Sequence, residues 1–501
     1  MVQGTRMKWW LCFLLAAMVG SGAESAGWKE SGLEVPEPAR EFRAAWVTSV
    51  YNLDWPSRPG LAKEVQQSEL RTLLDGAVKL GLNAVLLQIR PGGDALYASP
   101  LEPWSAVLTG TSGKHPGYDP LALAVAEAHQ RGLELHAWFN PFRAKAGKSA
   151  AAAGHWTVKH PDWLRGESPH LFMDPGVPGV QSHVLAVMRD VLTRYDVDGI
   201  HIDDYFYPYP VFGPGAVRLE VPLGDEALWQ SQNKGLSLAD WRRGNINHFV
   251  KSLYDMTKSV KPAARVGISP FGIWQPGVPA GIEARVNAYD HLYGDSRRWL
   301  QEGWCDYLAP QLYWPIQPAP QSFTTLLEWW TAQSTERPVW PGMAVDRMAS
   351  IKPPVLPMTE LTDQMAAVRR TAPVPGAVLW RIKFLTTDAR GVGTLLREKC
   401  YAARALPPAA PWLGMQLPGK PILQVITGPA SLRLSWTPTG GAAVRWWSVQ
   451  TRQAGTWSQE PLVFKNQSGV TLQGPVEAVA VRGLSETGTA SAPMVWSSSD
   501  S

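Results

Sequence analysis

The sequence contains few cysteines and no recognisable pattern of metal ligands. Only three cysteines occur among 501 residues; Cys12 lies in an apolar N-terminal segment, which leaves Cys305 and Cys400. Neither has metal-ligand spacing, and no close set of His, Asp or Glu residues supplies one. We therefore expect neither a metal centre nor a cofactor. Cys305 and Cys400 would pair in an oxidising compartment or remain two buried thiols, and the sequence leaves both alternatives open.

Strong net charge and two familiar catalytic motifs are also missing. Lys and Arg number 47 against 43 Asp and Glu, a net charge of +4, and no run of basic residues occurs. This balance argues against a protein that binds nucleic acid. No glycine-rich phosphate loop follows the first expected strand, and no Gly-x-Ser-x-Gly elbow is present. Nothing therefore favours a dinucleotide-binding fold or a serine esterase.

The one apolar run near the N-terminus is too short to span a bilayer. It extends from Trp9 to Val19, two basic residues precede it, and the small residues Ser21-Gly22-Ala23 follow it. This order is typical of an export signal, here residues 1–23. A lipoprotein would need a cysteine just after the run, whereas Cys12 lies inside it. We expect a cleaved signal and a periplasmic or exported protein without a stable membrane span; an uncleaved anchor is the alternative.

Tryptophan, by contrast, is abundant. The chain has 25 tryptophans, and many lie beside Pro, Gly or polar residues, as in Asp54-Trp55-Pro56, Pro103-Trp104-Ser105 and Tyr313-Trp314-Pro315. Flat aromatic faces in such loops suit the apolar face of a sugar ring, although about half of the tryptophans are expected simply to fill the core.

Segments of strand and helix character alternate along residues 40–404. The expected strands are 42–48, 83–90, 133–139, 198–203, 265–269, 306–314, 338–344 and 376–381. Helical periodicity separates them, as in Leu70 to Val78. Eight such repeats predict an α/β fold, a (β/α)8 TIM barrel, with an open doubly wound sheet as the alternative.

The C-terminal part changes character. Residues 405–418 are rich in Ala and Pro and are expected to form a linker. Short strands between turn signals follow over residues 419–497 and predict a small β-sandwich that resembles a fibronectin type III module. At the other end of the chain, residues 24–41 are polar, contain two prolines and are expected to be a leader.

Two adjacent carboxylates end the fourth expected strand, Asp198-Gly199-Ile200-His201-Ile202-Asp203, with Asp204 next. Barrel active sites lie at the C-terminal ends of the strands. Side-chain alternation points His201 and Asp203 into the barrel and leaves Asp204 at the rim. Neighbouring carboxyls repel, which raises one pKa, so the pair offers an acid and a base for glycoside hydrolysis. The alternative is that they only cap or salt-bridge the loop.

Polar residues at the other strand ends are candidates for holding a substrate. They are Arg43, Gln88, Arg90, Asn140, Ser269, Gln311, Tyr313, Asp346 and Arg381. Arg90 and Asn140 look like positioning residues, or equally like anchors of loops. A buried histidine below a site, such as His201, is more often structural than catalytic.

Several motifs point to one family. They are Phe42 to Val47, Gln88 to Tyr97, Glu102 to Ser105, Pro116 to Leu121, His136 to Arg143, Asp198 to Pro210, Gly267 to Gly272 and Tyr307 to Trp314. Over residues 40–400 they resemble the glycosyl-hydrolase-like 10 family. The resemblance implies a barrel that hydrolyses bacterial glycan strands, namely peptidoglycan lacking stem peptides. It makes a strand of GlcNAc and MurNAc the expected partner, and proteins of cell division or the cell wall natural further partners.

A second resemblance concerns mechanism. The run Asp198 to Asp203 is similar to the fourth strand of chitinase-like barrels, and Gln311-x-Tyr313 and Trp380 are similar to their sixth and eighth strands. In those enzymes the N-acetyl group of the substrate is the nucleophile. The resemblance implies that Asp203 orients this group, that Tyr313 assists and that Trp380 stacks on the sugar. Their acid falls at Tyr205 here, and Asp204 is the only nearby replacement.

The leading hypothesis is a glycosidase for GlcNAc/MurNAc strands, with Asp203 and Asp204 as catalytic carboxylates in a two-carboxylate or N-acetyl-assisted mechanism. The residues expected to bind substrate are Arg90, Asn140, His201, Gln311 and Tyr313, with Trp138, Tyr205, Tyr207, Trp274, Trp314 and Trp380 as stacking surfaces. The alternatives are a non-catalytic glycan-binding protein and a hydrolase of an amino-sugar exopolysaccharide.

Overall fold

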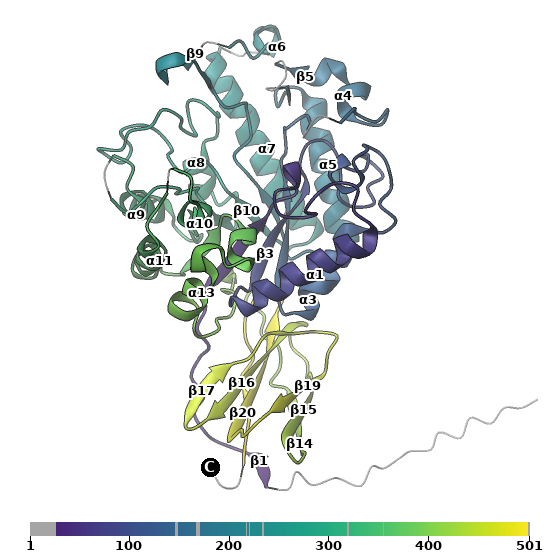
Figure 1. The fold of residues 1–501 in the computed structure, drawn as a ribbon, viewed down its shortest axis with the longest axis vertical. Coiled ribbons are helices and arrows are strands. Elements are labelled where there is room, and N and C mark those ends of the chain that lie inside the picture. The colour runs from purple at the N-terminus through teal and green to yellow at the C-terminus, as the bar shows by residue number, and fades with distance from the viewer. Residues whose placement is uncertain are drawn as a thin grey trace, which may run out of the picture.

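The computed structural model describes residues 27–498 apart from 146–148, 167–170, 217, 220, 233–234, 318–319 and 354. It consists of an α/β barrel and a smaller β unit, drawn below the barrel in Figure 1. The expected signal peptide, residues 1–23, lies outside the described residues. Among those that are described, no helix is both long and apolar enough to cross a bilayer.

The barrel has eight parallel strands that pair in chain order. They are β2 (Phe42–Val47), β3 (Ala84–Arg90), β4 (Glu134–Phe139), β7 (Gly199–Ile202), β10 (Arg265–Ile268), β11 (Tyr307–Leu308), β12 (Gly342–Met343) and β13 (Gly376–Leu379). β13 pairs with β2, and parallel bridges Leu308–Val339 and Gln311–Gly342 join the sixth and seventh strands. The ring of strands is thereby closed. The fold is TIM-barrel-like, as the sequence predicts, and not an open sheet.

Helices cover the outside of the barrel (Figure 1). The main ones are α1 (Lys63–Lys79), α3 (Pro120–Gln130), α5 (Pro178–Arg194), α7 (Leu238–Val260), α8 (Ser296–Gln301), α9 (Phe323–Gln333), α11 (Thr359–Thr371) and α12 (Ile382–Thr386). Two of them begin with a side-chain cap. The Asp119 carboxylate accepts the Ala122 N–H at 3.0 Å at the start of α3, and the Ser237 hydroxyl accepts the Asp240 N–H at 3.1 Å at the start of α7.

Alternate residues of the barrel strands face opposite sides of the wall. In β2, Trp46 belongs to a cluster inside the barrel, whereas Val47 packs outward against the helices. In β7, Ile202 packs outward and His201 reaches inward to the Trp46 indole. This alternation directs Asp203, the next inward position, into the top of the barrel.

The C-terminal unit consists of two antiparallel sheets. One contains β1 (Trp28–Glu30), β21 (Met494–Ser498), β20 (Ala478–Ser485), β16 (Val444–Gln453), β17 (Thr456–Gln459) and β18 (Val463–Phe464). The other contains β14 (Ile422–Thr427), β15 (Ser431–Thr437) and β19 (Gly469–Gln473). The sheets share an apolar core, in which the Trp436 and Trp447 rings lie 5.7 Å apart. A β-sandwich is therefore present, and its likeness to fibronectin type III stays a prediction.

The N-terminal segment does not form a mere leader. Residues Trp28–Glu30 make the edge strand β1, paired with β21, and Trp28 is buried in the core of the sandwich. The described part of the chain thus begins in the C-terminal unit and then runs to the barrel (Figure 1). A three-residue strand is too short to show periodicity, so its sequence gives no signal for this pairing.

Residues 405–418 are also more than a linker. The Ala405 carbonyl accepts a hydrogen bond from the Asn83 amide at 3.1 Å, and Leu406 bridges Arg40. The indole of Trp412 donates to Asp306 at 2.9 Å. The segment is held here because the N-terminal ends of the barrel strands present polar groups, which its backbone and Trp412 satisfy.

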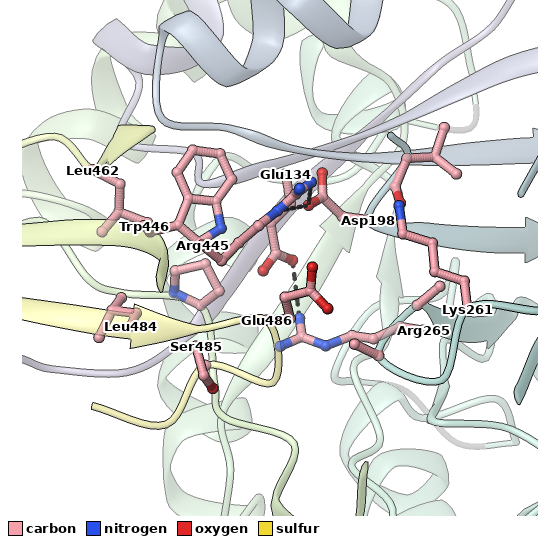
Figure 2. Close-up of a pocket in the computed structure, with 15 residues that line it drawn as sticks. Glu134, Asp198, Lys261, Arg265, Arg445, Trp446, Leu462, Leu484, Ser485 and Glu486 are labelled. Atoms are coloured by element: carbon pink, nitrogen blue, oxygen red, sulfur yellow. Dashed lines mark hydrogen bonds and ion pairs between the residues drawn. The ribbon is translucent and has the colours of Figure 1, made fainter. Parts of the chain in front are cut away.

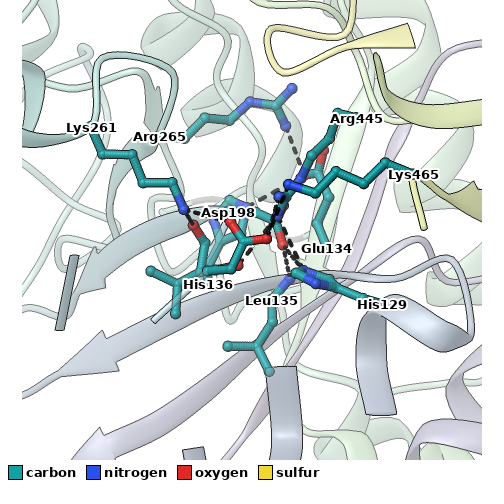
Figure 3. Close-up of polar contacts among 11 residues, drawn as sticks. His129, Glu134, Leu135, His136, Asp198, Lys261, Arg265, Arg445 and Lys465 are labelled. Atoms are coloured by element: carbon teal, nitrogen blue, oxygen red, sulfur yellow. Dashed lines mark hydrogen bonds and ion pairs between the residues drawn. The ribbon is translucent and has the colours of Figure 1, made fainter. Parts of the chain in front are cut away.

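The sandwich covers the N-terminal end of the barrel, opposite the expected active site. Arg445 of β16 reaches into the barrel and donates to Asp198, just before β7, at 2.6 Å (Figure 3). Asp198 also contacts His129 at 2.9 Å and accepts the Leu135 N–H at 2.8 Å. Figure 2 shows the small cavity left at this junction, of about 30 Å³. The sandwich therefore anchors the start of the strand whose far end carries the paired carboxyls.

The structure resolves the alternatives for the cysteines. Cys305 and Cys400 are both buried and both free, and burial raises the pKa of each thiol. They are therefore unreactive structural residues rather than a disulfide. Within the described residues, no group of three or more His, Cys, Asp or Glu side chains is arranged to hold a metal ion.

Candidate active site

The structure places Asp203 and Asp204 directly after β7, at the end of the barrel that faces away from the sandwich. Both are nearly buried, with 7% and 8% of their surface exposed. Their partners come from different sides of the barrel, because Asp203 faces inward and Asp204 begins the following loop. The two carboxyls are therefore held separately although they are neighbours in the chain.

A relay of side-chain amides fixes the partner of Asp203. The backbone N–H groups of Ser49 and Val50 both donate to Oε1 of Gln88, at 2.9 and 2.8 Å. Gln88 must then present its NH2 group to Oδ1 of Asn140, 2.5 Å away. Asn140 in turn donates from Nδ2 to the Asp203 carboxylate. The orientation of each amide follows from the one before it, so Asn140 can only donate to Asp203.

Asp204 has a different kind of partner. The hydroxyl of Tyr209, five residues further along the loop, donates to Oδ2 of Asp204. The amide of Gln311, after β11, also lies beside this carboxyl and itself donates to the Ser269 carbonyl at 3.0 Å. A hydroxyl can turn and accept a proton as well as donate one, which a fixed amide NH2 cannot do.

Burial raises the pKa of both carboxyls. Desolvation raises the pKa of Asp203 to about 7; the positive charge of Arg143 opposes this rise and the negative charge of Asp204 adds to it. Burial also raises the pKa of Asp204, and the Tyr209 hydroxyl and Gln311 amide partly offset it. Neighbouring buried carboxyls titrate as a pair, because ionisation of one opposes ionisation of the other, so the pair can hold one proton between them. Such a pair provides an acid and a carboxylate at the same time.

His201 lies in a hydrogen-bonded layer below the pair and is fully buried. The Trp46 indole N–H lies 3.2 Å from its Nε2, and because indole only donates, the proton of His201 is on Nδ1. Nδ1 donates to the Tyr307 hydroxyl at 3.0 Å, which is also 2.9 Å from His136. Burial and His136 lower the pKa of His201 well below its usual value. This corrects the expectation of a substrate contact: His201 is neutral and has both nitrogens engaged inside the barrel.

An aromatic floor lies beside the carboxyls at the end of β13. Trp380 is half-buried, and its ring lies 6.0 Å from Trp46, 6.3 Å from Trp138 and 6.4 Å from the half-buried Tyr313. Trp138 is only 4% exposed, so it supports Trp380 instead of offering a stacking face of its own. Its indole N–H lies beside Asp203 and helps to lower the pKa of that carboxyl. Tyr313 thus lies near the pair, and Trp380 adjoins both Tyr313 and Trp138.

Arg90 anchors a loop and does not reach the cleft. It is fully buried, and its guanidinium binds the Glu102 carboxylate through Nη2 at 2.6 Å and Nε at 2.8 Å. A further nitrogen donates to the Asn140 carbonyl at 2.7 Å. The long loop after β3 folds back over the strand end, and this ion pair fastens it there. This corrects the expectation that Arg90 holds substrate: all of these contacts go to loops of the protein itself, as in the alternative that the sequence left open.

Tyr207 is likewise not a stacking surface. Its side chain is fully buried and meets Tyr293 edge-on at 5.1 Å, while the Arg242 guanidinium lies 5.7 Å from its ring. Arg242 belongs to α7 and also binds the buried Asp225. The ring therefore fixes the loop after β7 to α7, which is why an aromatic residue stands there.

The other expected stacking residues lie along the rim. Tyr205 is half-buried, and the Arg143 guanidinium covers its ring at 4.8 Å. Trp314 meets Phe271 edge-on at 5.8 Å, and Phe271 meets Tyr209 at 6.3 Å, which makes an aromatic wall beside Asp204. The structure brings Trp314 to this wall.

Trp274 lies among its own neighbours after β10. Its ring stacks at 6.0 Å on Trp329, lies 5.0 Å from Tyr289 and has the Arg297 guanidinium 5.3 Å from its centre. Because these groups cover the ring, Trp274 offers less surface for a sugar than the sequence suggests.

The sequence did not indicate that Arg143 and Tyr209 belong to the site. It identified Gln88 only as a polar residue at the end of a strand. Arg143 is the cation of the run His136 to Arg143, so its charge near two carboxylates was a usable signal. Gln88 could have been found from the same alternation that finds Asp203. No local pattern indicates that Tyr209 turns back to Asp204, because the path of the loop decides it.

The chain is similar to several known proteins. A family model described as Glycosyl hydrolase-like 10 matches residues 41–351. The glycosyl hydrolase YngK of Bacillus subtilis is 38% identical over 83% of this chain and 82% of its own, and the glycosyl hydrolase DigH of Escherichia coli is 32% identical over 75% and 91%. Among solved structures, the PgaB (BpsB) glycoside hydrolase domain from Bordetella bronchiseptica aligns with a TM-score of 0.47 and 15% identity, over 72% of this chain and 99% of that one.

Proposed function

This chain belongs to the Glycosyl hydrolase-like 10 family and is a glycosidase, and from that premise we propose that it cleaves bacterial cell-wall strands of GlcNAc and MurNAc that lack stem peptides. The proposal rests on the Asp203/Asp204 pair, which shares one proton beside the floor formed by Trp380 and Tyr313. Family membership favours hydrolysis over a non-catalytic binding role. Peptide-free strands suit a site whose carboxyls are almost buried, because a bulky stem peptide would hinder their approach.

We assign the proton of the pair to Asp204. Although burial raises the pKa of Asp203, both of its oxygens face groups that only donate, the NH2 group of Asn140 at Oδ2 and the Tyr205 N–H at Oδ1, 3.4 Å away. The partner of Asp204 is the Tyr209 hydroxyl, which accepts as readily as it donates. In the reaction Asp204 therefore gives its proton to the leaving glycosidic oxygen, and Asp203 acts as the carboxylate.

The position of the pair favours help from the substrate itself. Asp203 and Asp204 both follow β7 directly, so in our proposal they line one wall of the cleft. A mechanism with two protein carboxylates places them on opposite faces of the sugar ring, about 5–9.5 Å apart. In our proposal the carbonyl oxygen of the 2-acetamido group attacks C1 instead, and Asp203 accepts a hydrogen bond from its N–H. Water then opens the cyclic intermediate, and its proton returns to Asp204.

The aromatic floor and the polar residues at the rim would each contact one of the two sugars that flank the cleaved bond. Trp380 would stack beneath the sugar that carries the reacting acetamido group, with the Tyr313 hydroxyl directed at that group. Gln311 lies beside Asp204, where it can contact the leaving sugar. These roles predict that Trp380→Ala lowers kcat/KM mainly by weakening stacking, which is worth about 1–3 kcal/mol for an aromatic contact of this kind.

The decisive experiment is mass spectrometry of the products from denuded and peptide-bearing peptidoglycan, with an amino-sugar exopolysaccharide as a third substrate. We expect soluble sugar products without peptides, and we expect them from the denuded strands alone. Asp204→Asn should abolish their release while the circular dichroism spectrum stays native. Asp75→Asn, which changes a carboxylate that is 65% exposed in its side chain, is the matched control and should keep full activity. Full activity of Asp204→Asn would refute the assignment of the acid, and preference for the exopolysaccharide would refute the substrate.

A further inference from the structure

Arg143 stands at the end of β4 with its backbone firmly held. The preceding residue, Phe142, accepts the Met173 N–H at 2.9 Å, and Arg143 itself forms an antiparallel bridge with Phe172. Its guanidinium lies over the Tyr205 ring, 4.8 Å from the centre, and Nη1 donates to the Pro91 carbonyl at 3.2 Å. The planar group is therefore supported on one face and pinned at one nitrogen.

The charge of Arg143 has no counter-ion among the described residues. Two other arginines at the same end of the barrel are paired, Arg90 with Glu102 at 2.6 Å and Arg381 with Asp54 at 2.9 Å. For Arg143, by contrast, no carboxylate of the described chain lies within ion-pair distance, and the hydrogen bond to Pro91 uses one of five N–H donors. A half-buried guanidinium with free donors is thus presented at the cleft.

The contact with the Tyr205 ring, 4.8 Å from its centre, brings this charge to the segment that carries the two carboxyls. Arg143 lowers the pKa of Asp203 and of Asp204, against the rise caused by burial. The Tyr205 ring that supports it follows Asp204 directly in the chain. The guanidinium therefore lies close enough to meet a group carried by the sugar that occupies the site.

We infer that Arg143 binds a carboxylate on the substrate, and so selects strands whose sugars carry a lactyl ether, as MurNAc does, over strands of neutral amino sugars. This inference rests on the proposed function. A planar guanidinium with free neighbouring N–H groups fits a carboxylate through two hydrogen bonds, a geometry that lysine cannot offer. A neutral strand would leave the same donors to water.

A simpler role must be separated from this one, namely that Arg143 only tunes the acidity of the two carboxyls. Tuning would affect every substrate alike, because the carboxyls act on all of them. Recognition of a carboxylate affects only substrates that carry one. The discriminating quantity is therefore the ratio of kcat/KM between two substrates that differ in that group alone.

The test uses denuded glycan strands with their lactyl carboxylates intact and the same strands with these groups converted to neutral methylamides. For the wild type we expect a kcat/KM ratio of about 10–100 in favour of the intact strands, the usual worth of hydrogen bonds to a charged group. Arg143→Met should bring this ratio close to 1. Lys145→Gln removes a positive charge two residues away without a guanidinium and should leave the ratio unchanged.

The outcomes separate the two proposals. Wild-type protein that cleaves both substrates equally well would overturn the role of Arg143 while the proposed function stands. Equal losses on both substrates in Arg143→Met, or a lost ratio in Lys145→Gln, would also overturn it. Failure of the wild type to cleave either substrate would overturn the proposed function itself. If Arg143→Met does not fold, Arg143→Lys is the second variant. It keeps the positive charge but loses the paired N–H donors of the guanidinium, so it should retain only part of the kcat/KM ratio between the two substrates.

Discussion

Replacement of Asn140 by leucine tests the amide relay that organises the carboxyl pair. Leucine has the same branched arrangement of side-chain heavy atoms as asparagine but cannot donate to Asp203, and the NH2 group of Gln88 loses its acceptor 2.5 Å away. A hydrogen bond to a charged group is worth about 1.5–3 kcal/mol. Because the bond stabilises the ionised form of Asp203, its loss raises the pKa of this carboxyl above the value of about 7 that burial gives it.

The consequence for activity follows from the sign of this shift. In our mechanism Asp203 must be ionised, so activity falls as pH drops through the pKa at which it gains a proton. At 1.36 kcal/mol per pH unit, the lost bond moves the acid limb of kcat/KM upward by about 1–2 pH units. It also draws the shared proton from Asp204 to Asp203, which lowers the maximum rate because the acid is then on the wrong group.

The assay is the pH dependence of sugar release from denuded strands between pH 4 and pH 9, with folding monitored by circular dichroism at each pH. Asn83→Leu is a suitable control, because it also removes a buried amide, one that bonds Glu41 and Ala405 at the opposite end of the barrel. We expect comparable destabilisation in the control without movement of the acid limb. An acid limb that stays in place in folded Asn140→Leu protein would refute the relay and the role of Asp203 as the carboxylate.

Two further predictions concern the buried ion pairs outside the cleft. Arg445→Met leaves the Asp198 carboxylate, 9% exposed, without its cation. Urea titrations should show a free energy of unfolding lower by about 3–5 kcal/mol. Adding Asp198→Asn to the same chain should restore part of this free energy. Because Arg445 helps to hold the pKa of Asp198 below its usual value, this difference should be full at neutral pH and shrink progressively as pH falls below about 3.9 towards the lowered pKa of Asp198. A loss independent of pH would contradict this. Arg90→Met should cost a similar amount and expose the loop after β3 to limited proteolysis, whereas unchanged protection would contradict its role as an anchor of that loop.

Much of the fold could be predicted because its signals are local. Each barrel strand is a short apolar run, and each helix has its own periodicity. The caps of α3 and α7 are also local, because they are formed by the side chains of Asp119 and Ser237 at the first turn. Burial of apolar faces leaves few ways to assemble eight such repeats, so the barrel followed from the pattern. The edge strand at Trp28 and the packed segment 405–418 escaped prediction because their stability comes from distant partners, β21 and the barrel base.

For the active site, the sequence by itself determined the place and the chemical type. Asp203 and Asp204 end a strand whose alternation sends one carboxyl inward and leaves the other at the rim, and that period of two is a property of the backbone. Trp380 and Tyr313 could be located in the same way, at the ends of other strands.

Only the tertiary structure decided what each polar group does. Arg90 and Arg143 both follow buried strands, yet one meets Glu102 and becomes an anchor while the other meets no carboxylate of the described chain. His201 lost its expected role to Trp46 and Tyr307, which engage both of its nitrogens. The physical reason is that strand periodicity fixes the direction of a side chain, whereas its pKa and its free hydrogen-bonding groups depend on the burial and partners that remote segments supply.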